Sequence, residues 1–356
     1  MTRSIPKEDV VRRIHSDGFV LDAHSDISLL DVYPRRLQGQ RGVMKKIHLP
    51  LHKKGGVHGA IITLHNDWAR WTTHYEGATK QTLELIEFMF QEERESGGGF
   101  VIAENGTQME EAHGKGKFSV LMSLEGAKAL EGSLEVLHAL YRLGVRAMGL
   151  THNVRNQYAD GAAVKENFGL TESGRRLVEE LDRLNMLLDL AHISERGFYD
   201  AIETTRHIPV ISHSACRSLH EFDGGKIPLR NVTDKQIQTL ADRGGVMGVA
   251  CLRPFLADSN ATIDHYVKHI EHMIKIVGVN HVGIGLDFVG YAPDINFALI
   301  GNTSINPYGK DAVAGLEDIT KTPNLTRALL RKGYSEGEVR KILGGNFVRV
   351  LKRVLG

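Results

Sequence analysis

The chain has 356 residues, of which 42% are hydrophobic and 24% charged, a balance typical of a globular protein with a sizeable core. Its formal net charge is +1 and it contains no basic block, so composition gives no support for a nucleic-acid partner. Two cysteines exclude a disulfide framework and a cysteine-type zinc cluster. The amino terminus lacks an apolar signal segment and no window is apolar over a bilayer's width, so we expect a cytoplasmic protein without a membrane partner.

Eight apolar runs of strand length recur along the chain. They occupy residues 19–26, 57–65, 118–124, 145–150, 186–191, 209–212, 245–250 and 281–286. The stretches between them mostly carry apolar residues at helical spacing, as residues 79–95 do. A helix is expected after Thr171, a residue type that often caps helices, and two more are expected at 325–331 and 336–354. Residues 27–55 are mixed polar and basic, and no strand or helix is assigned to them.

Eight strand-like runs that alternate with helices indicate a (β/α)8 barrel. The near-continuous apolar character of the runs suits parallel strands that helices cover on the outside. An open doubly wound sheet is the alternative, and it would usually carry a glycine-rich turn after its first strand. Here His24-Ser25-Asp26 ends that strand. We therefore predict a single (β/α)8 barrel domain over residues 1–356, with a C-terminal helical extension.

The first run ends in a pair of side chains that suit a metal. Alternate residues of a strand point to the same side, so His24 and Asp26 project together from its tip. An imidazole nitrogen beside a carboxylate oxygen makes half of a coordination shell for a divalent transition metal. On its own, such a pair is more often an ordinary strand-to-loop turn.

Metal-competent side chains recur at the ends of other runs. These residues are Glu125, His152, His192, His213 and Asp287. In a (β/α)8 barrel the carboxyl ends of the strands meet at one face and carry the chemistry. Each residue alone could be a helix cap or a loop residue, but their coincidence at the tips of separate strands favours one shared site.

The candidate ligands are too many for one catalytic zinc, which usually takes three protein ligands and a water. Two ions that share a carboxylate would use the set fully. His24 and Asp26 would hold one ion. His192 and His213 would hold the other, with Glu125 bound to both. Two close ions can activate one water and polarise the oxygen of the bond that it attacks, so we expect hydrolysis of an amide or a similarly stable bond.

The motifs that carry these residues run through nearly the whole chain. In chain order they are Leu21-Asp22-Ala23-His24-Ser25-Asp26, Ser123-Leu124-Glu125-Gly126, Leu150-Thr151-His152-Asn153, Ser212-His213-Ser214 and Gly283-Ile284-Gly285-Leu286-Asp287-Phe288. Their order and spacing resemble the renal (membrane) dipeptidase family of zinc metallopeptidases, within the amidohydrolase superfamily. Val289 stands where family members commonly carry a second aspartate, and the stretch 214–229 looks longer than is typical. Neither departure touches a ligand position.

The resemblance implies a binuclear zinc dipeptidase with two zinc ions per chain, bridged by Glu125. It implies that Asp287 is the general base that takes a proton from the metal-bridging water and returns it to the leaving amine. His152 would stabilise the oxyanion, and Arg230, or Arg217 in its place, would bind the C-terminal carboxylate of the substrate. The resemblance also implies broad specificity, often including a C-terminal D-residue, and a homodimer.

Two alternatives to this interpretation use or resemble the same site. Another amidohydrolase activity, such as deacylation of N-acyl amino acids, could use the same centre. A non-catalytic ligand-binding barrel would be expected to have lost a metal ligand or the proton shuttle, and all of these residues are present. Asp160 and Asp189 lie beside the motifs, and we expect either to support a ligand histidine through a hydrogen bond.

Overall fold

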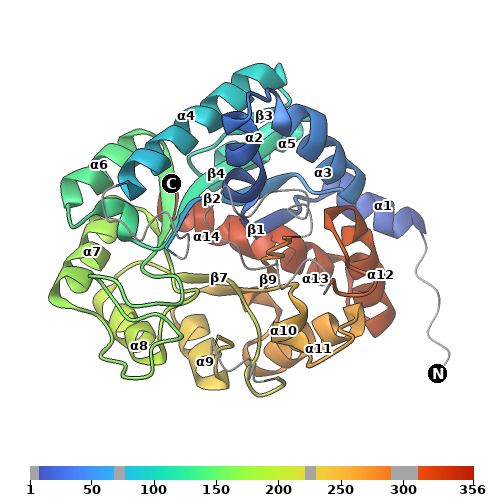
Figure 1. Cartoon of the computed structure of the whole chain (residues 1–356). Coiled ribbons are helices and arrows are strands. Elements are labelled where there is room, and N and C mark those ends of the chain that lie inside the picture. The colour runs from blue at the N-terminus through green and yellow to red at the C-terminus, as the bar shows by residue number, and fades with distance from the viewer. Residues whose placement is uncertain (1–7, 68–76, 221–229, 290–311) are drawn as a thin grey trace.

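The computed structural model describes residues 8–67, 77–220, 230–289 and 312–356, and one parallel sheet forms their centre (Figure 1). Its strands are β1 (Leu21–Ser25), β2 (Gly59–Asn66), β3 (Phe100–Ile102), β4 (Phe118–Glu125), β5 (Val145–Gly149), β6 (Leu187–Asp189), β7 (Val210–Ser214), β8 (Val246–Val249) and β9 (Val282–Ile284). They follow the order β1-β2-β4-β5-β6-β7-β8-β9, and β3 pairs with β4 outside this path.

The two ends of this order, β1 and β9, lie side by side and bring the barrel nearly to closure. The backbone N–H of Asp287 donates to the carbonyl of His24 at 3.2 Å. The backbone N–H of Leu286 donates to the carboxylate of Asp22 at 2.7 Å. The eight strands along the path, with helices between them, confirm the predicted (β/α)8 barrel.

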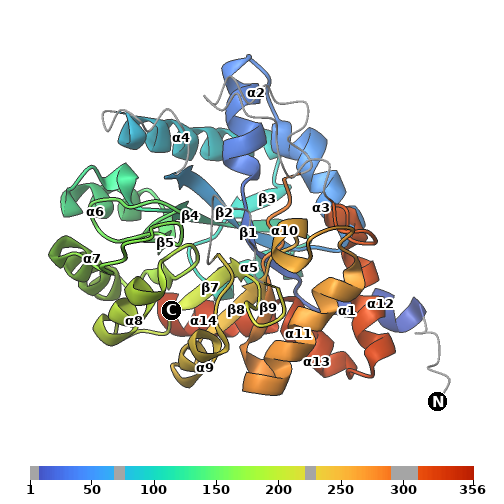
Figure 2. The ribbon, with the colours of Figure 1, turned by 60° about the horizontal axis from the view of Figure 1, so that its bottom comes forward.

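Helices surround the barrel, as Figures 1 and 2 show from two directions. The described α-helices are α1 (Glu8–Asp17), α2 (Tyr33–Leu37), α3 (Leu49–Gly55), α4 (Ala78–Ser96), α5 (Gly106–Gly114), α6 (Leu134–Arg142), α7 (Glu172–Arg183), α8 (Glu195–Thr204), α9 (Asp234–Asp242), α10 (Arg253–Leu256), α11 (Ile263–Val277), α12 (Thr322–Lys332), α13 (Glu336–Arg340) and α14 (Asn346–Leu355). Thr171 caps α7 as predicted, because its side chain accepts from the backbone N–H of Gly174. Among the described helices, none has the length and apolar character needed to cross a membrane.

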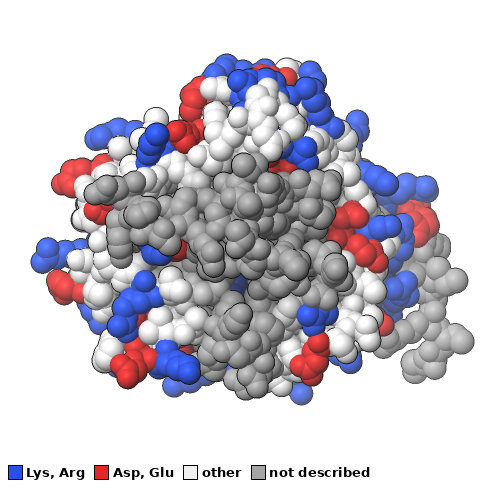
Figure 3. Space-filling view, viewed as in Figure 1, with Lys and Arg blue, Asp and Glu red and all other residues white. Residues whose placement is uncertain are grey.

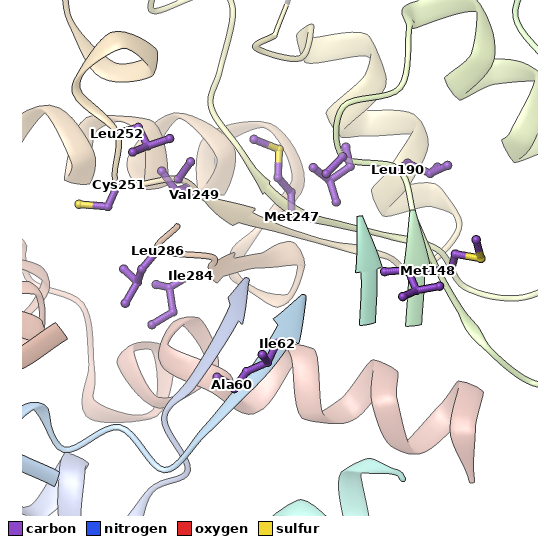
Figure 4. Packing of buried hydrophobic residues seen from close by; sticks show 14 of the residues in the cluster. Ala60, Ile62, Met148, Leu190, Met247, Val249, Cys251, Leu252, Ile284 and Leu286 are labelled. Atoms are coloured by element: carbon purple, nitrogen blue, oxygen red, sulfur yellow. The ribbon is translucent and has the colours of Figure 1, made fainter. Parts of the chain in front are cut away.

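Both faces of the barrel strands are covered by apolar side chains. On one side, residues such as Ile62, Met148 and Met247 belong to the large cluster that the surrounding helices complete (Figure 4). On the other side, Leu121 and Leu187 belong to a second cluster, which also contains apolar residues of α14. Strands that are buried on both faces read as near-continuous apolar runs, which explains the sequence pattern.

The C-terminal helix α14 packs against the amino-terminal part of the barrel. Its Phe347 and Leu351 share a buried cluster with Leu21, Val210 and Val246, each of which begins or nearly begins its strand. α14 therefore covers the end of the barrel that lies opposite the strand tips. This helix belongs to the C-terminal helical extension that the sequence predicts.

The predicted helix 336–354 is divided into α13, a π-helical turn (Lys341–Gly345) and α14. The interruption lies at Gly344, where the chain passes close to β1. A Cβ on Gly344 would lie 2.2 Å from the carbonyl oxygen of Phe19, so only glycine allows this approach. Helical periodicity continues across the break and hides it in the sequence.

Two further parts of the fold are not predicted by the sequence. β3 has three residues and pairs with the first half of β4, which leaves too few residues for a recognisable pattern. Residues 27–55 contain two π-helical turns, Ser28–Val32 and Met44–His48, in addition to α2 and α3. A buried pair between Asp31 and His48, at 2.8 Å, joins these two turns. A contact between two polar side chains does not add to the apolar periodicity by which a helix is recognised in a sequence.

Lys and Arg side chains alternate with Asp and Glu side chains around the described part of the face in Figure 3. The mixture of signs agrees with the net charge of +1.

Candidate metal centre

Every metal-competent residue predicted at a strand tip lies in, or shortly after, the corresponding strand. His24 is in β1, His213 is in β7, and Glu125 is the last residue of β4. The other residues follow strand ends at Asp26, His152, His192 and Asp287. All seven side chains are buried, and the structure brings them together at one end of the barrel.

Glu125 lies at the centre of this group. Its Oε1 is 2.7 Å from Nε2 of His192 and 3.4 Å from Nε2 of His213. The same oxygen is 3.5 Å from Nε2 of His24 and 4.0 Å from Nε2 of His152. Four imidazoles from four different strand ends thus surround one carboxylate oxygen.

Asp26 and Asp287 add two more carboxylates next to His24. Nε2 of His24 is 3.7 Å from Oδ1 of Asp26 and 3.9 Å from Oδ1 of Asp287. The second oxygen of Asp287 is 4.0 Å from Nε2 of His213. Asp287 therefore lies near histidines from two different strands, β1 and β7.

Irregular backbone at the strand ends aims these side chains. The pairing of β1 with β2 changes register between Asp22 and Ser25, and the pairing of β7 with β8 does so between Ile211 and Ser214. Such shifts redirect side chains next to active sites. His192 and Asp287 also have positive φ angles, 64° and 53°, which few residues other than glycine adopt. Each left-handed residue costs about 1–3 kcal/mol, a strain that is commonly found at functional sites.

The donor atoms fit a metal. Three overlapping groups have their ligand atoms within 4.8 Å of one another, namely His24-Glu125-His213, Glu125-His152-His192 and His24-Asp26-Asp287. Nε2 of His24 and Oδ1 of Asp26 are buried and have no hydrogen-bond partner among the described residues. A buried polar atom without a partner costs about 1–3 kcal/mol, which a bound cation would remove. Imidazole and carboxylate donors are the ligands of zinc and related divalent ions.

Burial holds these groups close to their neutral forms. It raises the pKa of Asp26 to about 7 and lowers the pKa of His24 to about 3. Burial, followed by the nearby charges of Asp26 and Asp287, also raises the pKa of Glu125. Burial, followed by the charge of Arg230, lowers the pKa of His192. The imidazoles are therefore neutral, which is the form that binds a metal, and the crowded carboxyl groups favour a multivalent cation.

Two candidate ligand histidines have hydrogen-bond partners that the sequence did not identify. Nδ1 of His192 lies 2.8 Å from Oδ1 of Asn153, and Nδ1 of His213 lies 2.8 Å from Oγ of Ser212. In both cases the other ring nitrogen, Nε2, faces Glu125. The signal available in the sequence was proximity, because Asn153 follows a candidate site histidine directly and Ser212 precedes one.

The two aspartates expected beside the site differ in their contacts. Asp160 was predicted to support a ligand histidine, and the structure does not support this prediction. Its carboxylate pairs with Arg155 and accepts the backbone N–H of Phe168, so it fixes the loop before α7. Asp189 instead accepts the backbone N–H of Ser212 at 2.9 Å, one residue from His213.

Of the two candidate arginines, Arg230 lies at the site. Its Nη2 donates to Nε2 of His192 at 3.1 Å and to the carbonyl of His213 at 3.0 Å. Arg217 pairs instead with Glu195 and donates to the carbonyl of Asn231. Most of the long stretch between the two arginines, residues 221–229, lies outside the described residues.

A (β/α)8 barrel with buried histidines and carboxylates at its strand tips defines the class of metal-dependent hydrolases. The comparisons agree with this class. A family model described as membrane dipeptidase (peptidase family M19) matches residues 8–296 and 303–355. The chain belongs to this family.

Three individual proteins are also similar to this chain. Dipeptidase tcpJ of Claviceps purpurea is 33% identical over 245 residues, 67% of this chain, and the match spans about half, 52%, of that protein. An amidohydrolase structure from Pseudomonas aeruginosa has a TM-score of 0.81 at 26% identity and covers 97% of this chain and 99% of its own. A metallo peptidase structure from Rhodobacter sphaeroides, liganded with a phosphinate mimic of the dipeptide L-Ala-D-Ala, has a TM-score of 0.79 at 26% identity, with coverage of 94% and 99%.

Proposed function

We propose that the protein hydrolyses the peptide bond of dipeptides with two zinc ions, one on His24 and Asp26 and one on His192 and His213. The observation that carries this proposal is the position of Glu125. Its Oε1 lies 3.5 Å from Nε2 of His24, on the first proposed ion, and 2.7 and 3.4 Å from Nε2 of His192 and His213, on the second. A carboxylate that lies beside both pairs of ligands is what a bridged pair of ions requires. When bound, the ions would activate a water and polarise the carbonyl that it attacks.

Asp287 would move the proton in this proposal. Its two carboxylate oxygens lie 3.9 Å from His24 and 4.0 Å from His213, so the carboxylate spans both halves of the ligand set. Burial, followed by the charge of Asp26, raises the pKa of Asp287. A raised pKa suits a carboxylate that takes a proton from water and holds it until the amine leaves.

His152 and Arg230 would hold the substrate. His152 stacks on His192 with ring centroids 4.0 Å apart, and a neutral imidazole there can donate an N–H to the oxyanion. Arg230 now donates to Nε2 of His192, and the same lone pair cannot also bind a metal. We therefore propose that Arg230 turns toward the C-terminal carboxylate of the substrate, which its planar guanidinium matches.

The proposal extends to specificity and assembly. The phosphinate that mimics L-Ala-D-Ala, bound in the Rhodobacter sphaeroides metallo peptidase, supports acceptance of a C-terminal D-residue. Broad side-chain tolerance, a homodimer and a cytoplasmic location complete the proposal, and light scattering of the purified protein tests the dimer.

A substrate screen with defined metal content tests the function. The protein is stripped with a chelator, reloaded with zinc, and assayed on L-Ala-L-Ala, L-Ala-D-Ala and N-acetyl-L-alanine. We expect dipeptide hydrolysis that returns with two zinc ions per chain and requires the free amine. Hydrolysis of the N-acyl compound alone would favour the deacylase alternative. A folded protein that retains less than one zinc per chain, with activity insensitive to chelators, would contradict the proposal.

A further inference from the structure

The end of β6 is connected to a ligand histidine of β7 by a chain of hydrogen bonds. Oδ1 of Asp189 accepts the backbone N–H groups of Ser212, at 2.9 Å, and of Ala191, at 3.0 Å. The Asp189 carboxylate also hydrogen-bonds the Ser212 side chain. Oγ of Ser212 in turn lies 2.8 Å from Nδ1 of His213. The path runs from a carboxylate, through a hydroxyl, to an imidazole whose Nε2 faces Glu125 at 3.4 Å.

The direction of each hydrogen bond follows from the chemistry of the groups. Burial raises the pKa of Asp189, while the two backbone N–H groups and the charge of Arg230 favour its ionised form. An ionised carboxylate only accepts, so the Ser212 hydroxyl donates to Asp189. The oxygen of that hydroxyl is then free to accept, and Nδ1 of His213 must carry the proton that it receives. This assigns the tautomer in which Nε2 of His213 keeps its lone pair toward the candidate metal site, where Nε2 of His192 lies 2.8 Å away.

We propose that Asp189, acting through Ser212, is a positioning residue for His213, and that it raises the affinity of this histidine for its metal ion. The inference rests on the proposed function, since it assigns support to one ligand of the same centre. Partners of this kind orient the ring and make the ligand more basic.

The second histidine of the same predicted ion has a different partner. Nδ1 of His192 lies against the side-chain amide oxygen of Asn153, which is neutral. Both histidines carry their proton on Nδ1. Of the two, only His213 is linked through its partner to a carboxylate, that of Asp189. Nε2 of His213 is therefore the more basic metal-binding nitrogen of the two. Loss of the Asp189 charge should lower the metal affinity by more than a change in the orientation of the His213 ring alone.

A small cavity inside the barrel supplies the matched control. It has a volume of about 10 Å³ and is lined by Asp189 and Ser212, and also by Ser123 of β4. Ser123→Ala removes a hydroxyl from the same cavity without touching the path to His213. Ser212→Ala removes the middle of the path, and Ser212→Thr keeps a hydroxyl there. Asp189→Asn keeps the Oδ1 that accepts two backbone N–H groups while it removes the charge.

The experiment measures zinc affinity by competition with a chromophoric chelator, for the full chain and each variant. We expect Ser212→Ala and Asp189→Asn to lose about 10- to 100-fold in affinity for one ion per chain. Ser123→Ala should match the wild type, and Ser212→Thr should recover most of the loss. The absorption spectrum of the cobalt-substituted protein should change in the first two variants, because the geometry at one ion changes.

Unchanged zinc affinity and cobalt spectra in both Ser212→Ala and Asp189→Asn would overturn the inference. An equal loss in Ser123→Ala would also overturn it, since the effect would then belong to the cavity. The proposed function fails in a different way, because a wild-type protein without tight zinc or dipeptide hydrolysis would fail before any variant is compared.

Discussion

Asp287 has two properties that its position in the sequence only partly reveals. The residue directly follows the eighth predicted run, 281–286, so a strand-tip carboxylate was expected. Its positive φ of 53° and its separation of 3.9 to 4.0 Å from two histidines are visible only in the structure. Backbone strain of this kind clusters at active sites, where the surrounding structure holds a residue in an otherwise unfavourable conformation.

Asp287→Asn tests the proton-transfer role. The amide keeps the shape of the side chain but cannot take up a proton, so we expect kcat to fall about 10²- to 10⁴-fold while both metals are retained. Steady-state kinetics and metal analysis of the same preparation measure the two quantities. Asp258→Asn is the control, because the side chain of Asp258 is 99% exposed and lies outside the site. Turnover close to that of the control would refute the role.

The buried side chain of His269, away from the metal centre, should make the free energy of unfolding depend on pH. Its Nδ1 accepts the backbone N–H of Cys216 at 3.0 Å, and burial lowers its pKa to about 4. The unfolded chain binds this proton near pH 6.5, so the stabilisation is present above pH 6.5 and is lost as the pH falls toward 4. Between pH 7 and pH 5 the loss amounts to about 2 kcal/mol.

His269→Asn places an amide oxygen near the position of Nδ1 and does not titrate. Urea unfolding at pH 7 and at pH 5 should therefore show a loss for the wild type that exceeds the loss for the variant by about 2 kcal/mol. Equal losses in the two proteins would show that His269 is protonated alike in the folded and unfolded chains.

The elements that carry the site were predictable because each leaves a local pattern. Apolar runs of four to eight residues marked β1, β4 and β7, and the metal-competent side chain at the end of each run marked the candidate ligand. The partners of the ligands were not predictable in this way. The contact of Ser212 with His213 depends on a register shift in β7, and that of Asn153 with His192 joins two different strand ends. Neither a rotamer nor a register shift is encoded by periodicity.

The division of the last helical stretch is also invisible to periodicity, and Gly344 is the residue that causes it. Gly344→Ala would place a Cβ 2.2 Å from the backbone of Phe19, and the chain would have to move. We expect a loss of about 1–3 kcal/mol in the free energy of unfolding. Gly337→Ala, in α13, meets nothing within 4 Å and should stabilise by about 0.5–1 kcal/mol. Urea midpoints of the two variants should move in opposite directions, and a shared direction would contradict this explanation.

Over the whole molecule, the last helix of the chain completes the core of the first strand. α14 packs against residues that begin β1, β7 and β8, so contacts between distant parts of the sequence connect the barrel. A chain arranged in this way is expected to unfold as one unit, which is the physical content of the proposed single domain. The location of this helix could be predicted from the sequence but its partners could not, because amphipathic spacing shows that a face is buried and not what buries it.

Phe347→Ala in α14 tests this cooperativity. The ring of Phe347 is fully buried, and a Cβ added to Gly283 of β9 would lie 2.4 Å from it, so the packing is tight. We expect a loss of about 3–5 kcal/mol, because truncation leaves a cavity that the barrel cannot fill. The loss should shift the far-ultraviolet and near-ultraviolet circular dichroism transitions together. Arg353→Ala, on the exposed face of the same helix, should stay within about 0.5 kcal/mol of the wild type. Separate transitions in Phe347→Ala would instead show that α14 and the barrel unfold independently.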